Sequence, residues 1–310
     1  MKSDNFPLPI YVGKRTFLGL RDLVVSLYAQ KCQFKCAYCN LPEKSHPEPL
    51  DPETTKRQID WVLDQNKNEL PDFRQFSIGN EGSILDLGRF PKETLDYLLI
   101  QTGRFPNLEI LSLETRPEYI KAPLMEEIQR VTGLPTIDVT VGFETQDDHL
   151  REVILKKNVR KKLMEQKIEL LGEIGARLTS YVLLKPGPAM TEQDGIDEAI
   201  RTIGYLHEKC RYFNTDLVIY LNPVYASKGT PLARQFVIHG YRFPQIQSVI
   251  QIIAATKHLD VPIYTGLWSE ENAEENGDYK SLDTHCAEVR GAVKQYNKTQ
   301  DFSAIEPFIM

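Results

Sequence analysis

The chain has 310 residues, which is enough for a full hydrophobic core in one large domain or in a domain with an appendage. Its composition is ordinary for a globular protein, and no run is long and apolar enough to predict a transmembrane helix. The net charge of −6 excludes the overall basic surface of a dedicated nucleic-acid binder. No secretory signal peptide is recognised, and we expect a cytoplasmic protein.

Short β-rich runs alternate with amphipathic helical runs along the chain. We expect the first strand at residues 23–28 and the first long helix at residues 52–65, with Asp51 as its N-cap. Further strands are expected at 74–79, 108–113, 137–143, 177–184 and 216–221, and helices at 92–102, 123–131, 161–172 and 192–208, the last capped by Thr191. This alternation predicts a parallel sheet with helices outside it.

The predicted fold class is α/β, a partial (β/α)6 TIM-like barrel over residues 16–230 with a C-terminal α/β extension over residues 231–310. The extension is expected to contain a helix at 244–258, a strand at 261–264, an acidic loop and a helix at 284–297. In parallel barrels the chemistry gathers where strands end and the following loops begin. Polar residues at the predicted strand ends are therefore the candidate site residues.

Three cysteines follow the first predicted strand at a C-x3-C-x2-C spacing: Cys32, Cys36 and Cys39. Three thiolates can hold three irons of a [4Fe–4S] cluster, which leaves one iron open to a small molecule. The spacing, together with the aromatic Tyr38 before the last cysteine, matches the radical S-adenosylmethionine (SAM) superfamily. The triplet therefore predicts a cluster site.

Other interpretations of the cysteines fit less well. An odd number of clustered cysteines disfavours disulfides, and a zinc site needs a fourth ligand, for which the nearest candidate, His46, has poor spacing. Three unliganded thiols on a polar loop would be unusual. The isolated Cys210 and Cys286 are interpreted as buried apolar residues rather than ligands. Free cysteines and an oxygen-labile cluster both point to a reducing cytoplasm.

A glycine-rich loop, Gly79-Asn80-Glu81-Gly82, follows the second predicted strand. Glycine lets the backbone approach a ligand closely, and Glu81 can accept hydrogen bonds from a cationic amine. A plain glycine-rich turn is the alternative.

Charged and polar residues also end the later predicted strands. Glu114 and Arg116 are two residues apart, so that Arg116 can clamp a carboxylate, or the pair can form a mutual salt bridge. Glu144 follows the predicted strand at 137–143 and adds a second carboxylate to the edge of the sheet where these strands end. Lys185 either meets a carboxylate of SAM or substrate or pairs with a glutamate. Asn222 is a candidate donor, although asparagine before proline is also common in turns.

A local basic stretch runs over residues 151–162. A solvated loop and helix start is the favoured interpretation, and a phosphate-binding patch is the alternative. Its members are Arg151, Lys156, Lys157, Arg160, Lys161 and Lys162.

Several phrases resemble one branch of the radical SAM superfamily, the archaeosine-pathway proteins, which are related to the radical SAM half of the Elongator catalytic subunit. The similarity runs over residues 16–301, in the phrases ETRPEY (114–119), LLKP (183–186), NPV (222–224) and TQD (299–301). Archaeal members of this branch act on a lysine-bearing deazaguanine in tRNA.

The resemblance implies a [4Fe–4S] cluster whose open iron is chelated by SAM, with reductive cleavage that usually yields a 5′-deoxyadenosyl radical. The residues at 79–81 take the place of the family's Gly-Gly-Glu loop, from which this sequence departs at Asn80. The expected SAM-binding residues are Tyr38, Gly79, Asn80, Glu81, Glu114, Arg116, Glu144, Lys185 and Asn222.

For the substrate, the sequence favours a small, amino-acid-like molecule, because the net charge is acidic, the cysteine loop is short and Cys286 stands alone near the C-terminus. A tRNA nucleoside is the alternative. Two others stay open: cleavage with transfer of a 3-amino-3-carboxypropyl group, and an iron–sulfur sensor or scaffold that is not an enzyme. The expected partners are the substrate and an electron donor such as flavodoxin or ferredoxin, and no membrane.

Overall fold

The computed structural model describes residues 6–225, 227–267 and 287–309. Its internal contacts divide the chain into two compact units. The first unit consists of Met1–Gln33 and Leu41–Val141, and the second of Phe34–Asn40 and Gly142–Met310. The predicted boundary at residue 230 stays a prediction.

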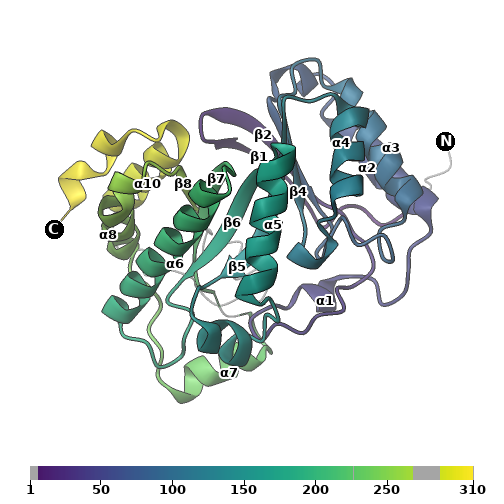
Figure 1. Ribbon diagram of the computed structural model, residues 1–310. Helices are drawn as coiled ribbons and strands as arrows, with labels where there is room; N and C mark the ends of the chain where they lie inside the picture. Colours follow the sequence, from purple (N-terminus) through teal and green to yellow (C-terminus); the bar gives the residue numbers. More distant parts are fainter. Residues whose placement is uncertain (1–5, 226, 268–286, 310) are drawn as a thin grey trace. The chain divides into compact units, whose positions relative to one another are not determined.

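The strands of the first unit follow one another in chain order across its sheet. An antiparallel hairpin opens the sheet, and the later strands pair in parallel (Figure 1). The strands are β1 (Tyr11–Phe17), β2 (Leu20–Ser26), β3 (Gln75–Gly79), β4 (Ile110–Glu114) and β5 (Thr136–Glu144), of which the last three residues belong to the second unit. The carboxyl ends of β3 and β4 therefore lie at one edge of this sheet.

Helices connect the parallel strands of the first unit. They are α1 (Leu41–Lys44), α2 (Pro52–Gln65), α3 (Lys92–Gln101) and α4 (Ala122–Thr132), with 3-10 turns at Leu70–Asp72, Thr102–Arg104 and Pro117–Tyr119. Helix α3 packs between α2 and α4 (Figure 1). The Asp51 carboxylate caps α2 by accepting hydrogen bonds from the Glu53 and Thr54 amides, as the sequence predicts.

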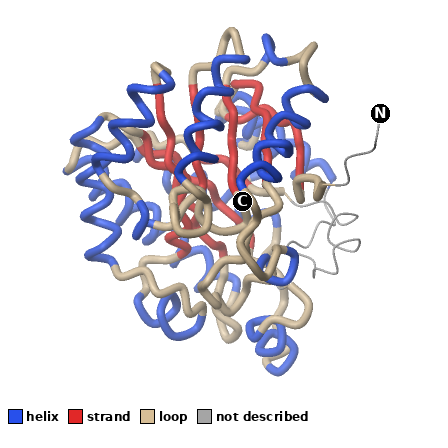
Figure 2. The backbone as a smooth tube through the Cα atoms, turned by 90° about the vertical axis from the view of Figure 1, so that its right-hand side faces the viewer, coloured by secondary structure: helices blue, strands red, loops and turns tan. Residues whose placement is uncertain are grey.

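Among the described residues of the second unit, the strands β6 (Arg177–Leu184), β7 (Leu217–Pro223) and β8 (Ile263–Thr265) pair in parallel and in chain order. Helices again separate the strands (Figure 2). They are α5 (Lys161–Ile174), α6 (Glu192–Tyr212), α7 (Pro231–Ile238), α8 (Ile246–Thr256) and α10 (Ala287–Thr299), with a π-helix at His149–Ile154 and 3-10 turns at Lys257–Leu259, Phe302–Ala304 and Glu306–Phe308.

Alternation along β6 and β7 gives their sheet two different faces. Val182, Leu184, Ile219 and Leu221 are fully buried on one face, which α6 packs against. The other face carries the half-buried Tyr181 and Tyr220 together with the buried Leu183. Thr191 and Asp194 form a capping box at the start of α6, which confirms the predicted cap.

The expected strands and helices are present, and those at 52–65 and 177–184 have the expected bounds. The first predicted strand begins three residues earlier than expected, as β2 at Leu20, and β1, α1, α7 and the π-helix were not expected. The expected start of the last helix at Thr284 and the interpretation of Cys286 lie outside the described residues. Within the described ranges, the structure contains no helix with the length and apolar character needed to cross a bilayer.

Candidate functional site

The segment Phe34–Asn40, which carries Cys36 and Cys39, is held by backbone and apolar contacts within the second unit. The Ala37 amide donates to the Leu155 carbonyl at 2.8 Å, and the Ala37 carbonyl accepts from the Leu232 amide at 2.9 Å. Both cysteines pack against a buried cluster made of Ala37, Tyr38, Leu155, Leu183, Val224, Leu232, Ala233 and Phe236. These contacts position the segment that carries the two thiols.

Tyr38, Glu144 and Lys157 form a buried triangle beside these cysteines. The Tyr38 hydroxyl donates to Glu144 Oε1 at 2.8 Å, and Lys157 Nζ donates to the same oxygen at 2.7 Å and to the Tyr38 hydroxyl at 3.0 Å. All three side chains are nine-tenths or more buried as residues. Burial, followed by the Glu144 charge, raises the pKa of Tyr38 well above its usual value, so the hydroxyl stays a donor.

The loop from β5 to α5 is built around two buried charged residues that support this triangle. Arg151 is fully buried and donates to the Thr145 carbonyl at 2.8 Å and the Val159 carbonyl at 2.6 Å, with its guanidinium 4.9 Å from the Phe143 ring centroid. The Glu198 carboxylate of α6 accepts hydrogen bonds from the Thr145 hydroxyl and the Asp147 amide. These contacts fix both ends of the segment that carries Lys157.

Backbone strain also marks this loop. Glu144, Lys156 and Asn158 have left-handed φ angles of 74°, 51° and 53°, which cost energy for residues with a side chain. Strained residues of this kind persist only where the surrounding contacts hold them. The strain lies at the predicted site residue Glu144 and on both sides of Lys157.

In the first unit, the loop after β3 places a carboxylate in a buried polar position. Glu81 has a φ of 58°, and its Oε1 accepts a hydrogen bond from the Ser26 hydroxyl. Its Oε2 and the Asn80 Oδ1 are buried and have no hydrogen-bond partner. Burial raises the pKa of Glu81, against the opposing effects of Ser26 and Lys44. A nearby cation would favour the ionised form of this carboxyl group.

The glycines of the same loop lie against other predicted site residues of the first unit. A Cβ on Gly79 would lie 3.2 Å from the Glu114 Cβ, and one on Gly82 would lie 3.6 Å from the Cys32 Cβ. The β3 loop therefore brings Gly79, Glu114 and Cys32 into one neighbourhood within this unit. This close approach explains why position 79 favours glycine.

Arg116 is buried next to this loop, and its guanidinium forms an ion pair with Glu118 at 2.6 Å. The Arg116 amide donates to the Ser83 hydroxyl at 3.1 Å. A salt bridge was expected for this arginine as one alternative, with Glu114 as the partner. Its role as a carboxylate clamp stays a prediction.

Lys185 follows β6 with a φ of 59° and is engaged within the second unit. Its Nζ donates to Glu192 Oε2 at 3.0 Å and to the Arg242 carbonyl at 2.8 Å, and it lies 4.9 Å from the Tyr241 ring centroid. The lysine thus pairs with a glutamate of α6 and not with the strand-end Glu144 considered in the sequence analysis. Its contact with SAM stays a prediction.

Three tyrosines line the face of the second unit's sheet that is opposite α6. Tyr181 and Tyr220 meet edge to face with ring centroids 5.1 Å apart, and Tyr220 and Tyr264 do so at 5.0 Å. The predicted residue Asn222 lies two positions after Tyr220, on the same face, and a Cβ on Gly266 would lie 2.2 Å from its Oδ1. This tyrosine ladder gives the sheet face a row of aromatic rings that meet edge to face.

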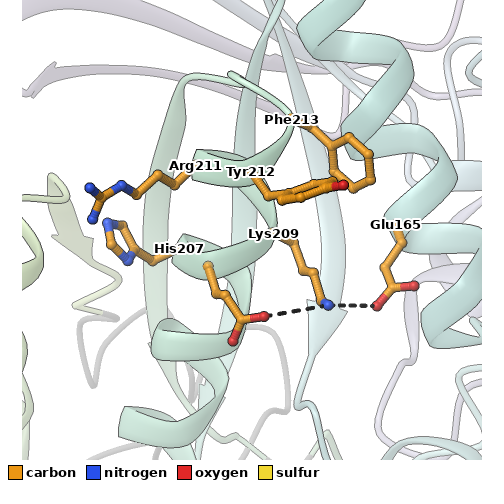
Figure 3. A pocket seen from close by; sticks show the side chains of 7 residues that line it. Glu165, His207, Lys209, Arg211, Tyr212 and Phe213 are labelled. Atoms are coloured by element: carbon orange, nitrogen blue, oxygen red, sulfur yellow. Dashed lines mark ion pairs between the residues drawn. The ribbon is translucent and has the colours of Figure 1, made fainter.

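A pocket of about 640 Å³ opens elsewhere in the second unit, between α5 and the end of α6 (Figure 3). Lys209 lies at its centre, with Nζ 3.5 Å from both Glu165 and Glu208. Tyr212 and Phe213 form one wall (Figure 3). None of the predicted site residues lines this pocket.

A site for a single metal ion needs several ligating side chains around one point. Among the described residues, no three His, Cys, Asp or Glu side chains converge closely enough to hold one ion. A [4Fe–4S] cluster makes a different demand, because it offers a separate iron to each thiolate.

The chain is similar to known proteins in both sequence and fold. No family model matches the chain. An uncharacterized protein of Methanocaldococcus jannaschii is 23% identical over 315 residues, covering 98% of this chain and 84% of the relative. The archaeosine synthase subunit beta of Thermococcus kodakarensis is 23% identical over 291 residues, covering 91% of this chain and 85% of the relative.

Among solved structures, a radical SAM methyltransferase from Sphaerobacter thermophilus superposes with a TM-score of 0.55 at 13% identity, covering 82% of this chain and 68% of that one. Streptococcus suis SuiB bound to S-adenosylmethionine gives 0.52 at 14% identity, covering 81% and 56%. The chain has the radical SAM fold. The predicted α/β partial barrel and the predicted relationship to the archaeosine-pathway branch are thereby confirmed.

Within this radical SAM fold, sequence reasoning missed the residues that support the predicted ones. Lys157 and Arg151 were placed in a basic stretch with a favoured solvated interpretation, yet both are buried. Glu198 was not singled out at all. The only sequence signal for Lys157 is Asn158 beside it, a residue type that tolerates left-handed backbone.

Proposed function

We propose that this chain is a radical SAM enzyme, with a [4Fe–4S] cluster on Cys32, Cys36 and Cys39. Reductive cleavage of SAM at such a cluster supplies a radical for attack on substrate. The proposal is carried mainly by the cysteine spacing, in a chain with the radical SAM fold. The protein's own part is to hold the cofactors, orient the substrate and exclude water.

The buried Glu81 carboxylate fits the ammonium group of SAM. Its Oε2 and the Asn80 Oδ1 are buried acceptors that lack a hydrogen-bond partner, and a buried acceptor is costly unless it is bonded. An ammonium group has three donors and a positive charge. We therefore assign Glu81 and Asn80 to the amino end of SAM, with the Gly79 backbone close to the ligand.

Replacing Glu81 with glutamine should weaken SAM binding by about tenfold to a hundredfold, because hydrogen bonds to charged groups contribute about 1.5–3 kcal/mol. Equilibrium dialysis with the cluster-loaded protein measures this. Glu69→Gln is the matched control, since Glu69 is an exposed carboxylate of the same unit that pairs with Lys14 and Arg21. Unchanged SAM affinity in Glu81→Gln would remove Glu81 from the proposed site.

For the substrate, the relatives and the tyrosine ladder favour a nucleoside in tRNA over the small molecule expected from the sequence. The relative from Thermococcus kodakarensis is named for archaeosine synthesis and aligns with 91% of this chain. Tyr181, Tyr220 and Tyr264 are half-buried aromatic rings, and the face of such a ring can stack with a planar base. The small amino-acid-like substrate is the second candidate, supported by the acidic net charge of −6.

Filter binding of bulk tRNA at two salt concentrations separates these candidates. We expect tRNA binding that weakens as salt rises, and a loss of about fivefold to a hundredfold in Tyr220→Leu, because stacking on an aromatic ring contributes about 1–3 kcal/mol per base. Tyr212→Leu is the control, since Tyr212 is 80% exposed at the end of α6. If no salt-sensitive binding is found near physiological ionic strength, the small-molecule candidate replaces the tRNA candidate.

Reductive cleavage of SAM requires an electron donor for the cluster. A flavodoxin or ferredoxin is the proposed electron donor, and a reducing cytoplasm is the proposed location. Mass spectrometry of the SAM-derived product distinguishes the modes of cleavage: deoxyadenosine indicates the usual one, and methylthioadenosine indicates 3-amino-3-carboxypropyl transfer. If neither product forms with a fully loaded cluster, the protein is a cluster scaffold and the enzyme proposal fails.

A further inference from the structure

We propose that Lys157 is a positioning residue for the cluster, acting through Glu144 and Tyr38 on the segment that carries Cys36 and Cys39. The inference rests on the proposed function, because it concerns the ligands of the proposed cluster. It starts from one observation: a lysine ammonium lies buried within hydrogen-bond distance of the aromatic residue between two of the three cysteines.

The geometry gives Lys157 a joining role. Its Nζ is 2.7 Å from Glu144 Oε1 and 3.0 Å from the Tyr38 hydroxyl, while the same Glu144 oxygen accepts the Tyr38 hydroxyl proton. Each member therefore contacts the other two. The triangle connects the end of β5, the β5–α5 loop and the cysteine segment, which are far apart in sequence.

The surrounding backbone is adapted to this ammonium. A Cβ on Gly142 would lie 2.4 Å from Lys157 Nζ and 2.4 Å from Glu144 Oε1, so a glycine is needed for the pair to fit. Lys156 and Asn158 hold left-handed φ angles on either side of Lys157. Burying a lysine is also rare unless it is paired. A lysine with only a surface role would need neither the glycine nor the strained backbone.

The phosphate-binding role considered for the basic stretch does not suit Lys157, because its ammonium is buried against Glu144. A role in positioning the cysteine segment is compatible with this burial. Without the ammonium, the Glu144 carboxylate would be left buried with a single donor from this triangle, and Tyr38 would lose one of its two polar anchors. The segment between Cys36 and Cys39 would then be held mainly by apolar packing and by the backbone bonds of Ala37.

Amide hydrogen exchange on the cluster-free protein tests this directly. In Lys157→Met, which keeps the length of the side chain and removes its charge, we expect exchange in residues 34–40 to accelerate at least tenfold. Exchange in β6 and α6 should stay as in the wild type. Tyr38→Phe, which deletes only the hydroxyl, should accelerate the same segment, and the double variant should exchange no faster than the faster single variant.

Lys209→Met is the matched control, because Lys209 is also an ion-paired lysine of the second unit, contacting Glu165 and Glu208 (Figure 3). It should leave exchange in residues 34–40 unchanged. If Lys157→Met unfolds the whole chain, Tyr38→Phe decides the question. Wild-type exchange of residues 34–40 in either variant that keeps its fold overturns the proposal.

A second readout separates positioning from a purely structural role. After anaerobic reconstitution, Lys157→Met should bind iron, but its reduced cluster should show an altered electron paramagnetic resonance spectrum in the presence of SAM and a more negative midpoint potential, because a nearby cation is lost. A spectrum and potential identical to the wild type would contradict a role toward the cluster. If the wild type itself takes up no cluster, the proposed function fails, whereas the exchange result still stands on its own.

Discussion

Replacing Cys36 with alanine should abolish reductive SAM cleavage. Cys36 is one of three thiolates proposed to hold the cluster, and a cluster with two remaining cysteines loses both its stability and its open iron in the right position. We expect less than about one thousandth of the wild-type product after anaerobic reconstitution, measured as deoxyadenosine or methylthioadenosine by mass spectrometry. Each factor of ten corresponds to about 1.4 kcal/mol in the barrier.

The chain offers a matched control in Cys210. This thiol is buried at the end of α6, and burial raises its pKa to about 12, so it is an inert apolar side chain. Cys210→Ala should keep the iron content and the cleavage activity of the wild type. Persistent cleavage in Cys36→Ala would refute the assignment of the cluster to these cysteines.

Replacing Arg151 with methionine should lower the free energy of unfolding by roughly 3–5 kcal/mol. Its fully buried guanidinium supplies the hydrogen bonds of the Thr145 and Val159 carbonyls. Methionine fills a similar length of space but donates nothing, so both carbonyls would be left without this donor. Urea unfolding followed by circular dichroism measures the change.

Arg104→Met serves as the comparison, because Arg104 also pairs with a carboxylate, Asp64 at 2.6 Å, yet the two side chains are 32% and 66% exposed. Surface ion pairs contribute little, so we expect a loss below about 1 kcal/mol. Equal losses in the two variants would mean that the burial of Arg151 is not what makes it important.

The sequence predicted most of the elements in each unit, because local rules determine them. Asp51 and the apolar pattern that follows it predict α2 with the observed bounds, and β6 follows from its continuous apolar run. The hairpin strand β1 was missed because its residues are mostly polar or half-exposed and its pairing with β2 is a tertiary feature. Helix α7 was missed because it is only eight residues long.

The sequence predicted those site residues whose type and spacing alone indicate a ligand-binding role. Cys32, Cys36, Cys39 and Glu81 could be singled out in this way. Lys157 could not, because nothing in a run of lysines and arginines tells which one the fold buries. Its partner Glu144 was predicted, but as a ligand-binding residue, since the contact between them spans a π-helix that the sequence did not indicate.

The left-handed backbone at Glu81, Glu144 and Lys185 limits how this protein can be made more robust. Glycine is the residue that such angles favour, so a glycine at each position would relieve local strain. The same change would remove the Glu81 or Glu144 carboxylate or the Lys185 ammonium, each of which is a proposed site residue. Engineering for thermal stability should therefore leave these three positions unchanged. Stabilising substitutions are better placed on the outer helices, where they do not replace a proposed site residue.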